Sequence, residues 1–99
     1  MEKDITILKI IEILKLKINF SIVEIIDYWE ADLCAIGLRK GNRLVYISTF
    51  NYLENQELNY DFDFEIVDLN NNSRLNIIKV GRNVKEAELI YEIKCFLNV

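Results

Sequence analysis

The sequence predicts an α+β domain of two layers, in which an antiparallel sheet of about five strands carries an N-terminal and a C-terminal helix on one face. Three observations predict it. Apolar residues recur with helical spacing near both ends of the chain, strand-like alternation fills the middle, and short polar turns separate the alternating runs. A length of 99 residues is the size of one domain, so we treat residues 1–99 as a single domain.

The first segment, from about Asp4 to Lys17, is expected to be a helix with Asp4 as its N-cap. Its apolar residues fall on one arc, and its charged and polar residues fall on the opposite arc. The apolar arc consists of Ile7, Ile10, Ile11, Leu14 and Ile18. Many of these side chains are β-branched, so packing against the sheet is expected to stabilise the helix more than intrinsic propensity does.

Three strands are expected in the next part of the chain, which is rich in Ile, Val, Tyr, Phe and Trp. They are expected over residues 20–29, 31–39 and 43–50. Turn residues at 40–42, Lys-Gly-Asn, predict a hairpin between the second and third strands. The second strand places a row of small side chains on one face, and we expect a helix to lie closely on it. These side chains belong to Ala31, Leu33, Ala35 and Gly37.

The segment YDFDFEIVDL, residues 60–69, is expected to be the fourth strand, after a loop over residues 51–59. Its alternation places apolar side chains on one face and carboxylates on the other. The face expected to contact the core carries Tyr60, Phe62, Phe64 and Ile66. The opposite face carries Asp61, Asp63 and Glu65.

A polar turn over residues 69–73 and a fifth strand over residues 74–80 are expected next, and Gly81-Arg82-Asn83 is expected to end that strand. The last element is expected to be a helix in which Asn83 and Glu86 form a capping box. Its buried arc is expected to contain Leu89, Ile90, Ile93, Phe96 and Leu97. A weaker apolar line is expected to pack against the first helix, with a partner contact as the alternative. This line consists of Val84, Tyr91 and Cys95.

The composition excludes several classes of enzyme. The chain has no histidine, so Ser-His-Asp and Cys-His catalytic arrangements are impossible. Two cysteines cannot form a structural zinc site, and three glycines do not form a phosphate-binding loop. We therefore expect a protein that is not an enzyme and that has no catalytic residue, no metal ligand and no cofactor.

Cysteine usage and charge bear on the compartment and the partner. Cys34 and Cys95 are far apart in apolar contexts, and we expect free thiols. The N-terminal segment lacks the unbroken apolar run of a signal peptide, so we expect a cytoplasmic protein without a membrane span. A net charge of −4 argues against direct nucleic-acid binding and favours a basic partner.

The carboxylates of Asp61, Asp63 and Glu65 allow three interpretations. They could form a solvated strand face that protects the sheet from edge pairing, an acidic recognition surface, or ligands for a divalent cation. Alternate residues of a strand stand about 6–7 Å apart, so without ligands from elsewhere they form a charged stripe rather than a metal cage. The first two interpretations stay open at this point.

The last forty residues resemble small bacterial immunity proteins of polymorphic and contact-dependent growth-inhibition toxin systems. The resemblance rests on the acidic-aromatic strand YDFDFEI, a polar turn, the short strand IIKV and the segment GRNVKEAELIYEIKCFL. It implies a protein that binds one cognate toxin domain and blocks the toxin's active site or its access to substrate. Many such toxins are basic nucleases, so the partner is expected to be a basic protein domain.

The resemblance also implies which residues bind the partner. Charge would come from Asp61, Asp63 and Glu65, joined by Glu30 and Asp32. Aromatic anchors would come from Tyr28, Trp29, Tyr52 or Tyr60, because Tyr and Trp are frequent at interface hot spots. For Tyr60 and Trp29, a place in the core is an equal alternative. Replacing the three strand carboxylates together is expected to leave the fold intact and to slow association with the toxin.

Three alternatives remain beside the immunity protein. One is a phage-encoded or antitoxin-like inhibitor that mimics nucleic acid. Another is a small-molecule-binding or regulatory domain with a pocket between helices and sheet, where Ala31, Ala35 and Gly37 leave room. The third is an enzyme that uses carboxylates alone.

Overall fold

The computed structural model describes residues 3–68, 70 and 73–99, and it has the expected α+β architecture. The helices are α1 (Ile5–Lys17) and α2 (Glu86–Leu97), and a short 3-10 helix, η1, spans Phe50–Tyr52. The strands are β1 (Glu24–Ile26), β2 (Ala35–Lys40), β3 (Arg43–Ser48), β4 (Tyr60–Asp68) and β5 (Ser73–Val84).

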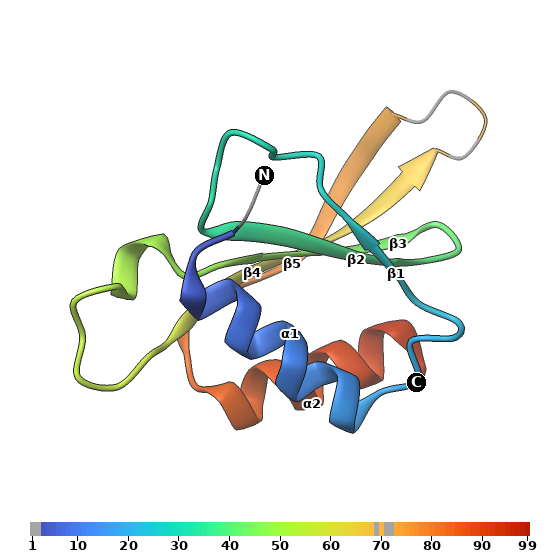
Figure 1. The fold of residues 1–99 in the computed structure, drawn as a ribbon. Coiled ribbons are helices and arrows are strands. Elements are labelled where there is room, and N and C mark those ends of the chain that lie inside the picture. The colour runs from blue at the N-terminus through green and yellow to red at the C-terminus, as the bar shows by residue number, and fades with distance from the viewer. Residues whose placement is uncertain (1–2, 69, 71–72) are drawn as a thin grey trace.

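The five strands form one open antiparallel sheet in the order β1-β2-β3-β4-β5, so each strand pairs with its neighbour in the sequence. Both helices lie on the same face of this sheet, as expected (Figure 1). The connection between β1 and β2 passes over the other face (Figure 1). We call that second face the open face, because no helix of the described chain covers it.

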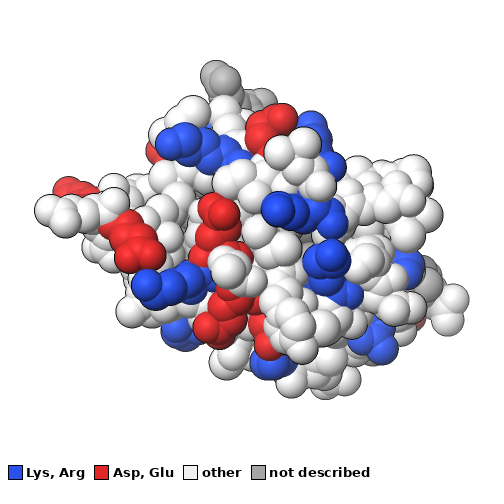
Figure 2. All heavy atoms as spheres, turned by 90° about the horizontal axis from the view of Figure 1, so that it is seen from below, with Lys and Arg blue, Asp and Glu red and all other residues white. Residues whose placement is uncertain are grey.

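Helix α1 confirms the sequence-based prediction. The Asp4 carboxylate caps it by accepting a hydrogen bond from the Thr6 N–H at 3.0 Å. The predicted apolar arc is buried against the sheet: Ile7, Ile10, Ile11, Leu14 and Ile18. Acidic side chains gather in a band near the middle of the helix layer, and basic side chains lie around them (Figure 2).

Strand β1 is much shorter than predicted, because hydrogen-bonded turns bend the chain on both sides of it. The Asn19 side-chain oxygen accepts hydrogen bonds from the N–H and hydroxyl of Ser21, which makes a local turn before the strand. After the strand, the Asp32 N–H donates to the Trp29 carbonyl at 2.8 Å and closes another turn. β-propensity in residues 20–29 therefore yields to local hydrogen bonds at both ends.

The β2–β3 hairpin is confirmed, with Lys40 paired to Arg43 and Gly41 at a positive φ of 61°. Strand β2 begins at Ala35 rather than at residue 31. The row of small side chains does not receive a helix, because the helices contact the other face of β2, through Ile36 and Leu38. Instead, the Trp29 ring packs directly on Gly37. A Cβ added at Gly37 would lie only 2.9 Å from Trp29 Cζ3.

Strand β5 continues to Val84, past the predicted break at Gly81. Glycine is needed there for packing, because a Cβ at Gly81 would lie only 2.1 Å from Cε2 of the Phe62 ring. Asn83 is a strand residue at a positive φ of 56°, and it is not a helix cap. The predicted capping box is therefore wrong: Lys85 is the N-cap, and its side chain makes no capping hydrogen bond.

Strand β5 is an edge of the sheet, and three of its aliphatic side chains are more than half exposed: Ile77, Ile78 and Val80. Its pairing with β4 is interrupted by three register shifts. Lys79 lies within this exposed run and forms an ion pair with Glu92 of α2. The predicted turn over residues 69–73 lies largely outside the described residues.

Helix α2 packs the predicted arc onto the sheet, and Ile90 is the one member of that arc that is only partly buried. The Phe96 ring stacks on Phe64 of β4 with centroids 4.3 Å apart, and the Arg43 guanidinium lies 5.0 Å from the Phe96 ring centroid. The predicted second line does not pack against α1. Val84 joins the core from β5, whereas Tyr91 and Cys95 are exposed.

Candidate functional site

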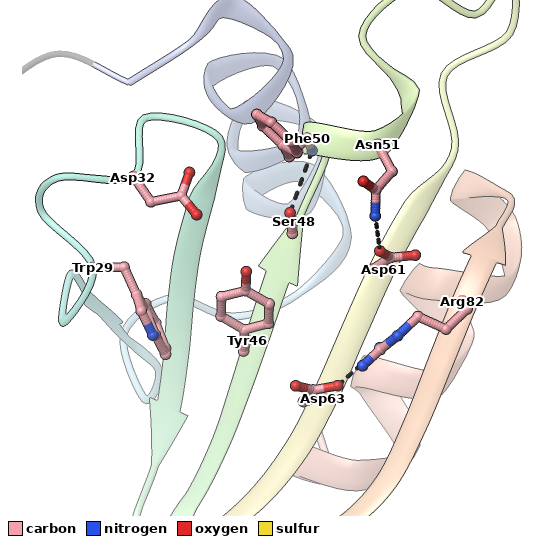
Figure 3. Close-up of a pocket in the computed structure, with 9 residues that line it drawn as sticks. All are labelled: Trp29, Asp32, Tyr46, Ser48, Phe50, Asn51, Asp61, Asp63 and Arg82. Carbon is pink, nitrogen blue, oxygen red and sulfur yellow. Dashed lines mark hydrogen bonds and ion pairs between the residues drawn. The ribbon is translucent and has the colours of Figure 1, made fainter.

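A pocket of about 500 Å³ opens on the open face of the sheet (Figure 3). Five parts of the chain form it: the β1–β2 connection, β3, the η1 segment, β4 and β5. We call it the open-face pocket. Its lining residues are Trp29, Asp32, Tyr46, Ser48, Phe50, Asn51, Asp61, Asp63 and Arg82.

An aromatic wall forms one side of the open-face pocket. The Trp29 and Tyr46 rings meet edge to face, with centroids 4.7 Å apart and planes 67° apart. Gly37 allows this arrangement because it leaves space for Trp29 above β2. Burial raises the pKa of the Tyr46 phenol, so its hydroxyl stays protonated at neutral pH.

A buried lysine holds the connection that carries this wall. The Lys3 ammonium donates to the Asp27 carboxylate at 2.8 Å and to the carbonyls of Trp29 and Asp32 at 3.1 and 2.8 Å. Its side chain is only 7% exposed. In the same connection, one oxygen of the Asp32 carboxylate accepts a hydrogen bond from the Cys34 N–H at 2.9 Å. These bonds fix Trp29 and Asp32 over the sheet.

Asp61 connects three elements from the opposite side of the pocket. Its carboxylate accepts hydrogen bonds from the Tyr52 hydroxyl, from the Asn51 amide at 3.0 Å and from the Asn83 N–H at 3.1 Å. All three donors are neutral, so they stabilise the negative charge without cancelling it. The hydrogen bond from Tyr52 to Asp61 raises the pKa of Tyr52, because the carboxylate holds the phenolic proton.

Among the described residues that line the pocket, Arg82 is the only cationic one, and Asp63 is paired with it. The Arg82 Nη1 atom lies 2.8 Å from Asp63 Oδ1, and it also donates to the carbonyls of Phe62 and Gly81. The ion pair raises the pKa of Arg82. The Arg82 side chain is nevertheless about half exposed, so the pair lies at the mouth of the pocket and not in its floor.

The carboxylates of β4 do not form a solvated stripe, which corrects one interpretation of the sequence. Asp61 is 7% exposed and Glu65 is 2% exposed, and the Asp63 carboxylate is also mostly covered. The β1–β2 connection, η1 and Arg82 lie over this face, and a sequence pattern confined to one strand carries no information about them. Glu65 does not line the open-face pocket.

The structure brings some predicted partner-binding residues together and separates others. Trp29, Asp32, Asp61 and Asp63 line the open-face pocket, and Tyr52 lies behind it, bonded to Asp61. Tyr60 is a core residue, 2% exposed, so it is no surface anchor. Tyr28 is partly exposed beside Trp29, and Glu30 is exposed but does not line the pocket.

Sequence reasoning missed Tyr46, Ser48, Phe50, Asn51 and Arg82 as lining residues. Strand pairing places two of them: Tyr46 lies opposite Asp63, and Ser48 lies opposite Asp61. Side chains of directly paired residues share one face of a sheet. The register between residues 43–48 and 60–66 would therefore have identified both, once these runs were paired as neighbours.

A second hollow, of about 760 Å³, lies between α1 and the connection that leads to β4. It is lined by Ile5, Leu8, Lys9, Glu12, Ile13, Gln56, Glu57, Leu58, Tyr60 and Glu86. The predicted space at Ala31, Ala35 and Gly37 is absent between helices and sheet. Ala35 and Gly37 are buried on the open face, and Ala31 is exposed in the β1–β2 connection.

Both cysteines are free thiols, as predicted. Cys34 is buried, and desolvation raises its pKa, whereas Cys95 is exposed on α2. Within the described ranges, no three carboxylate or thiol side chains converge as metal ligands would.

Comparison of the chain with protein-family models, with curated proteins and with solved structures found no match. In the part of the chain that the structure describes, neither α1 nor α2 is long and apolar enough to cross a membrane.

Proposed function

We propose that this chain is an immunity protein that binds one cognate toxin domain and neutralises it by covering the toxin's active or substrate-binding site. One observation carries the proposal. A sheet face that no helix of the described chain covers holds a pocket in which aromatic rings and carboxylates meet, and this is the composition of a hot spot for a basic protein.

Charge supports a basic partner. The chain carries a net charge of −4, which favours encounter with a positively charged domain and accelerates association at low salt. The resemblance of the last forty residues to small bacterial immunity proteins favours the same partner class, a toxin domain such as a basic nuclease.

The rim of the open-face pocket supports a protein partner. Several large apolar side chains on the β1–β2 connection and on the η1 segment, which both contribute to the pocket, are substantially exposed: Tyr28, Leu33, Phe50 and Leu53. Phe50 is 65% exposed and lines the pocket directly. Apolar and aromatic side chains around a polar pocket are typical of protein interfaces, where they exclude water from the central contacts.

A co-expression experiment tests the proposal. The polypeptide encoded directly upstream of this chain is expressed in bacteria with and without it, and growth and complex formation are measured. We expect the upstream polypeptide alone to stop growth, and we expect this chain to restore growth and to co-purify in a 1:1 complex. An upstream product that is harmless, or that stays toxic in the presence of this chain, contradicts the proposal.

The nucleic-acid mimic is a weaker alternative on this structure. Such a mimic needs a row of solvent-facing charges spaced like phosphates, and Asp61 and Glu65 are buried instead. It predicts inhibition of unrelated nucleic-acid-binding proteins, whereas an immunity protein neutralises one partner.

The second hollow favours the small-molecule alternative, because its lining is largely apolar and Tyr60 forms part of it. Thermal unfolding in the presence of a panel of small apolar and amphipathic compounds tests this alternative. A saturable rise in Tm that a Leu8→Lys substitution abolishes would support it.

A further inference from the structure

The charges of the open-face pocket are not balanced. Three carboxylates line it, those of Asp32, Asp61 and Asp63, and one guanidinium, that of Arg82. The nearby Lys3 ammonium is already paired with Asp27. Two negative charges therefore have no cation of their own among the described residues that line the pocket, and they attract a cationic group from outside.

The arrangement of these charges suits one cationic group rather than a surface. Asp32 lies on the β1–β2 connection at one side, and Asp61 and Asp63 lie across the pocket on β4 (Figure 3). The Trp29 and Tyr46 rings form the wall next to Asp32 (Figure 3). A group entering from solvent would meet carboxylates on two sides and aromatic rings on a third.

The chain itself shows that a guanidinium fits one of these carboxylates, that of Asp63. Arg82 already places one against Asp63, at the mouth of the pocket, and only part of its side chain is covered. A planar guanidinium also stacks on aromatic rings and donates to two carboxylates at once, which a lysine ammonium does less well. A volume of about 500 Å³ is within the range of sites that hold small organic groups.

We propose that the open-face pocket binds the guanidinium of one arginine side chain, against the Trp29–Tyr46 wall and between Asp32 and the β4 carboxylates, with Arg82 as its internal competitor for Asp63. This inference rests on the proposed function, because it assigns the arginine to the partner protein. A free small guanidinium compound has the same chemistry and is the other source.

Trp29 makes the test direct, because it is the only tryptophan in the chain and part of the pocket wall. Its fluorescence is titrated with N-acetyl-arginine methylamide, and the neutral analogue N-acetyl-citrulline methylamide is the control ligand. We expect a saturable change with the arginine compound, with a Kd on the order of 1–10 mM, as befits a single side chain. No saturable change, or an equal response to the citrulline compound, overturns the proposal.

Three variants test the assigned roles. Asp32→Asn keeps the oxygen that accepts from the Cys34 N–H and removes the charge, and we expect about ten-fold weaker binding. Arg82→Gln frees Asp63, and we expect binding to become several-fold tighter. Glu54→Gln removes an exposed charge that does not line the pocket, and its binding should match that of the unmodified chain. Weaker binding by Arg82→Gln contradicts the role of Arg82 as competitor.

Two further results separate the possible sources of the guanidinium. Micromolar affinity for free agmatine would identify a small molecule as the ligand and would overturn the assignment to a partner arginine. Millimolar affinity for agmatine, with loss of toxin neutralisation in Asp32→Asn, supports that assignment. Neutralisation that Asp32→Asn leaves unchanged would overturn the arginine inference while the proposed function stands.

Discussion

Gly81 is required by space alone: the Phe62 ring lies over it in the β4–β5 pairing, and its backbone continues the strand. Tyr60 is the opposite case, a large side chain whose surroundings in the core determine the protonation of its hydroxyl. At the scale of single residues, the structure therefore makes two predictions, one about packing and one about pH.

Gly81→Ala is expected to destabilise the protein by about 2–3 kcal/mol, because the added methyl group overlaps the Phe62 ring in a packed core. The free energy of unfolding is measured with chemical denaturant. Gly41→Ala is the matched control. It strains a positive φ of 61° in open space, and it should cost about 1 kcal/mol. Equal losses for the two variants would contradict the close contact at Gly81.

Tyr60 is expected to make the protein less stable at high pH. Burial raises its pKa to about 12, from an ordinary value of 10.0, because the charged phenolate loses its hydration in the core. The stability that Tyr60 contributes to the folded state is therefore fully present below pH 10 and is lost as the pH rises through 12. This loss is on the order of 2 kcal/mol.

Denaturant unfolding between pH 9 and 12 checks the prediction, with Tyr60→Phe as the comparison. The variant should lose less stability over this interval than the unmodified chain. Partly buried Tyr46 and hydrogen-bonded Tyr52 also have raised pKa values, so stability should still fall in the variant. Parallel curves for the two proteins would show that Tyr60 ionises as easily in the folded state as in the unfolded state.

At the scale of elements, two polar centres hold irregular segments against the open face. Lys3 fixes the β1–β2 connection on one side, and Asp61 fixes η1 and the end of β5 on the other. The open-face pocket lies between these segments, so its shape depends on both centres.

Lys3→Met is expected to loosen the β1–β2 connection, because three acceptors lose their shared ammonium donor. We expect a loss of about 2 kcal/mol in stability, a red shift of Trp29 emission and faster amide exchange over residues 27–34. Lys17→Met, at an exposed position in α1, is the control. Unchanged emission and exchange in Lys3→Met would show that the connection is held by other contacts.

Asp61→Asn is expected to cost about 1–3 kcal/mol, because an amide replaces one of two carboxylate oxygens that accept hydrogen bonds. Asp63→Asn, two residues away on the same face, breaks a partly exposed ion pair and should cost less than about 1 kcal/mol. Denaturant unfolding of both variants gives the comparison, and equal costs would contradict the role of Asp61. Replacement of Asp61, Asp63 and Glu65 together should therefore destabilise the fold, contrary to expectation from the sequence.

At the scale of the whole molecule, one sheet supports two different layers. The helices cover one face, and the Trp29-bearing connection covers part of the other. We expect both layers to unfold with the sheet in one transition. Trp29 fluorescence reports the open face, and far-UV circular dichroism reports the helices. Denaturation curves from the two probes should coincide, and an earlier fluorescence transition would show that the open-face layer unfolds separately.

Much of the fold is predictable from local patterns. The Asp4 cap, the apolar arcs of both helices and the alternation in β4 are each encoded within about a dozen residues. The residues that interrupt these patterns are less informative about where a strand or helix ends. Gly81 resembles a strand terminator, yet it is a contact point for Phe62, and Asn83 resembles a cap, yet its N–H is bonded to Asp61. In both cases a distant residue determines the role of the local one.

The candidate site was only partly predictable for the same reason. Asp61 and Asp63 belong to the alternating pattern of one strand, whereas Trp29 and Asp32 are suggested only by the resemblance to immunity proteins. The burial of these residues depends on a connection that folds over the sheet and on Lys3. Lys3 is distant from them in the sequence, and only the fold brings it close. The sequence predicts that Gly81-Arg82-Asn83 ends the fifth strand, so the pairing of Arg82 with Asp63 on the neighbouring strand could not be expected.

The edge strand β5 has a consequence for the solubility of the protein. Its exposed Ile77, Ile78 and Val80 offer an aliphatic ribbon to any extended chain, and edge strands of this kind are frequent starting points of aggregation. Lys79 interrupts the ribbon with a charge, and the register shifts against β4 keep the edge irregular. The solubility of the protein at high concentration will therefore depend on the charge of Lys79. Acetylation of this one side chain would remove the charge and leave the edge open to aggregation.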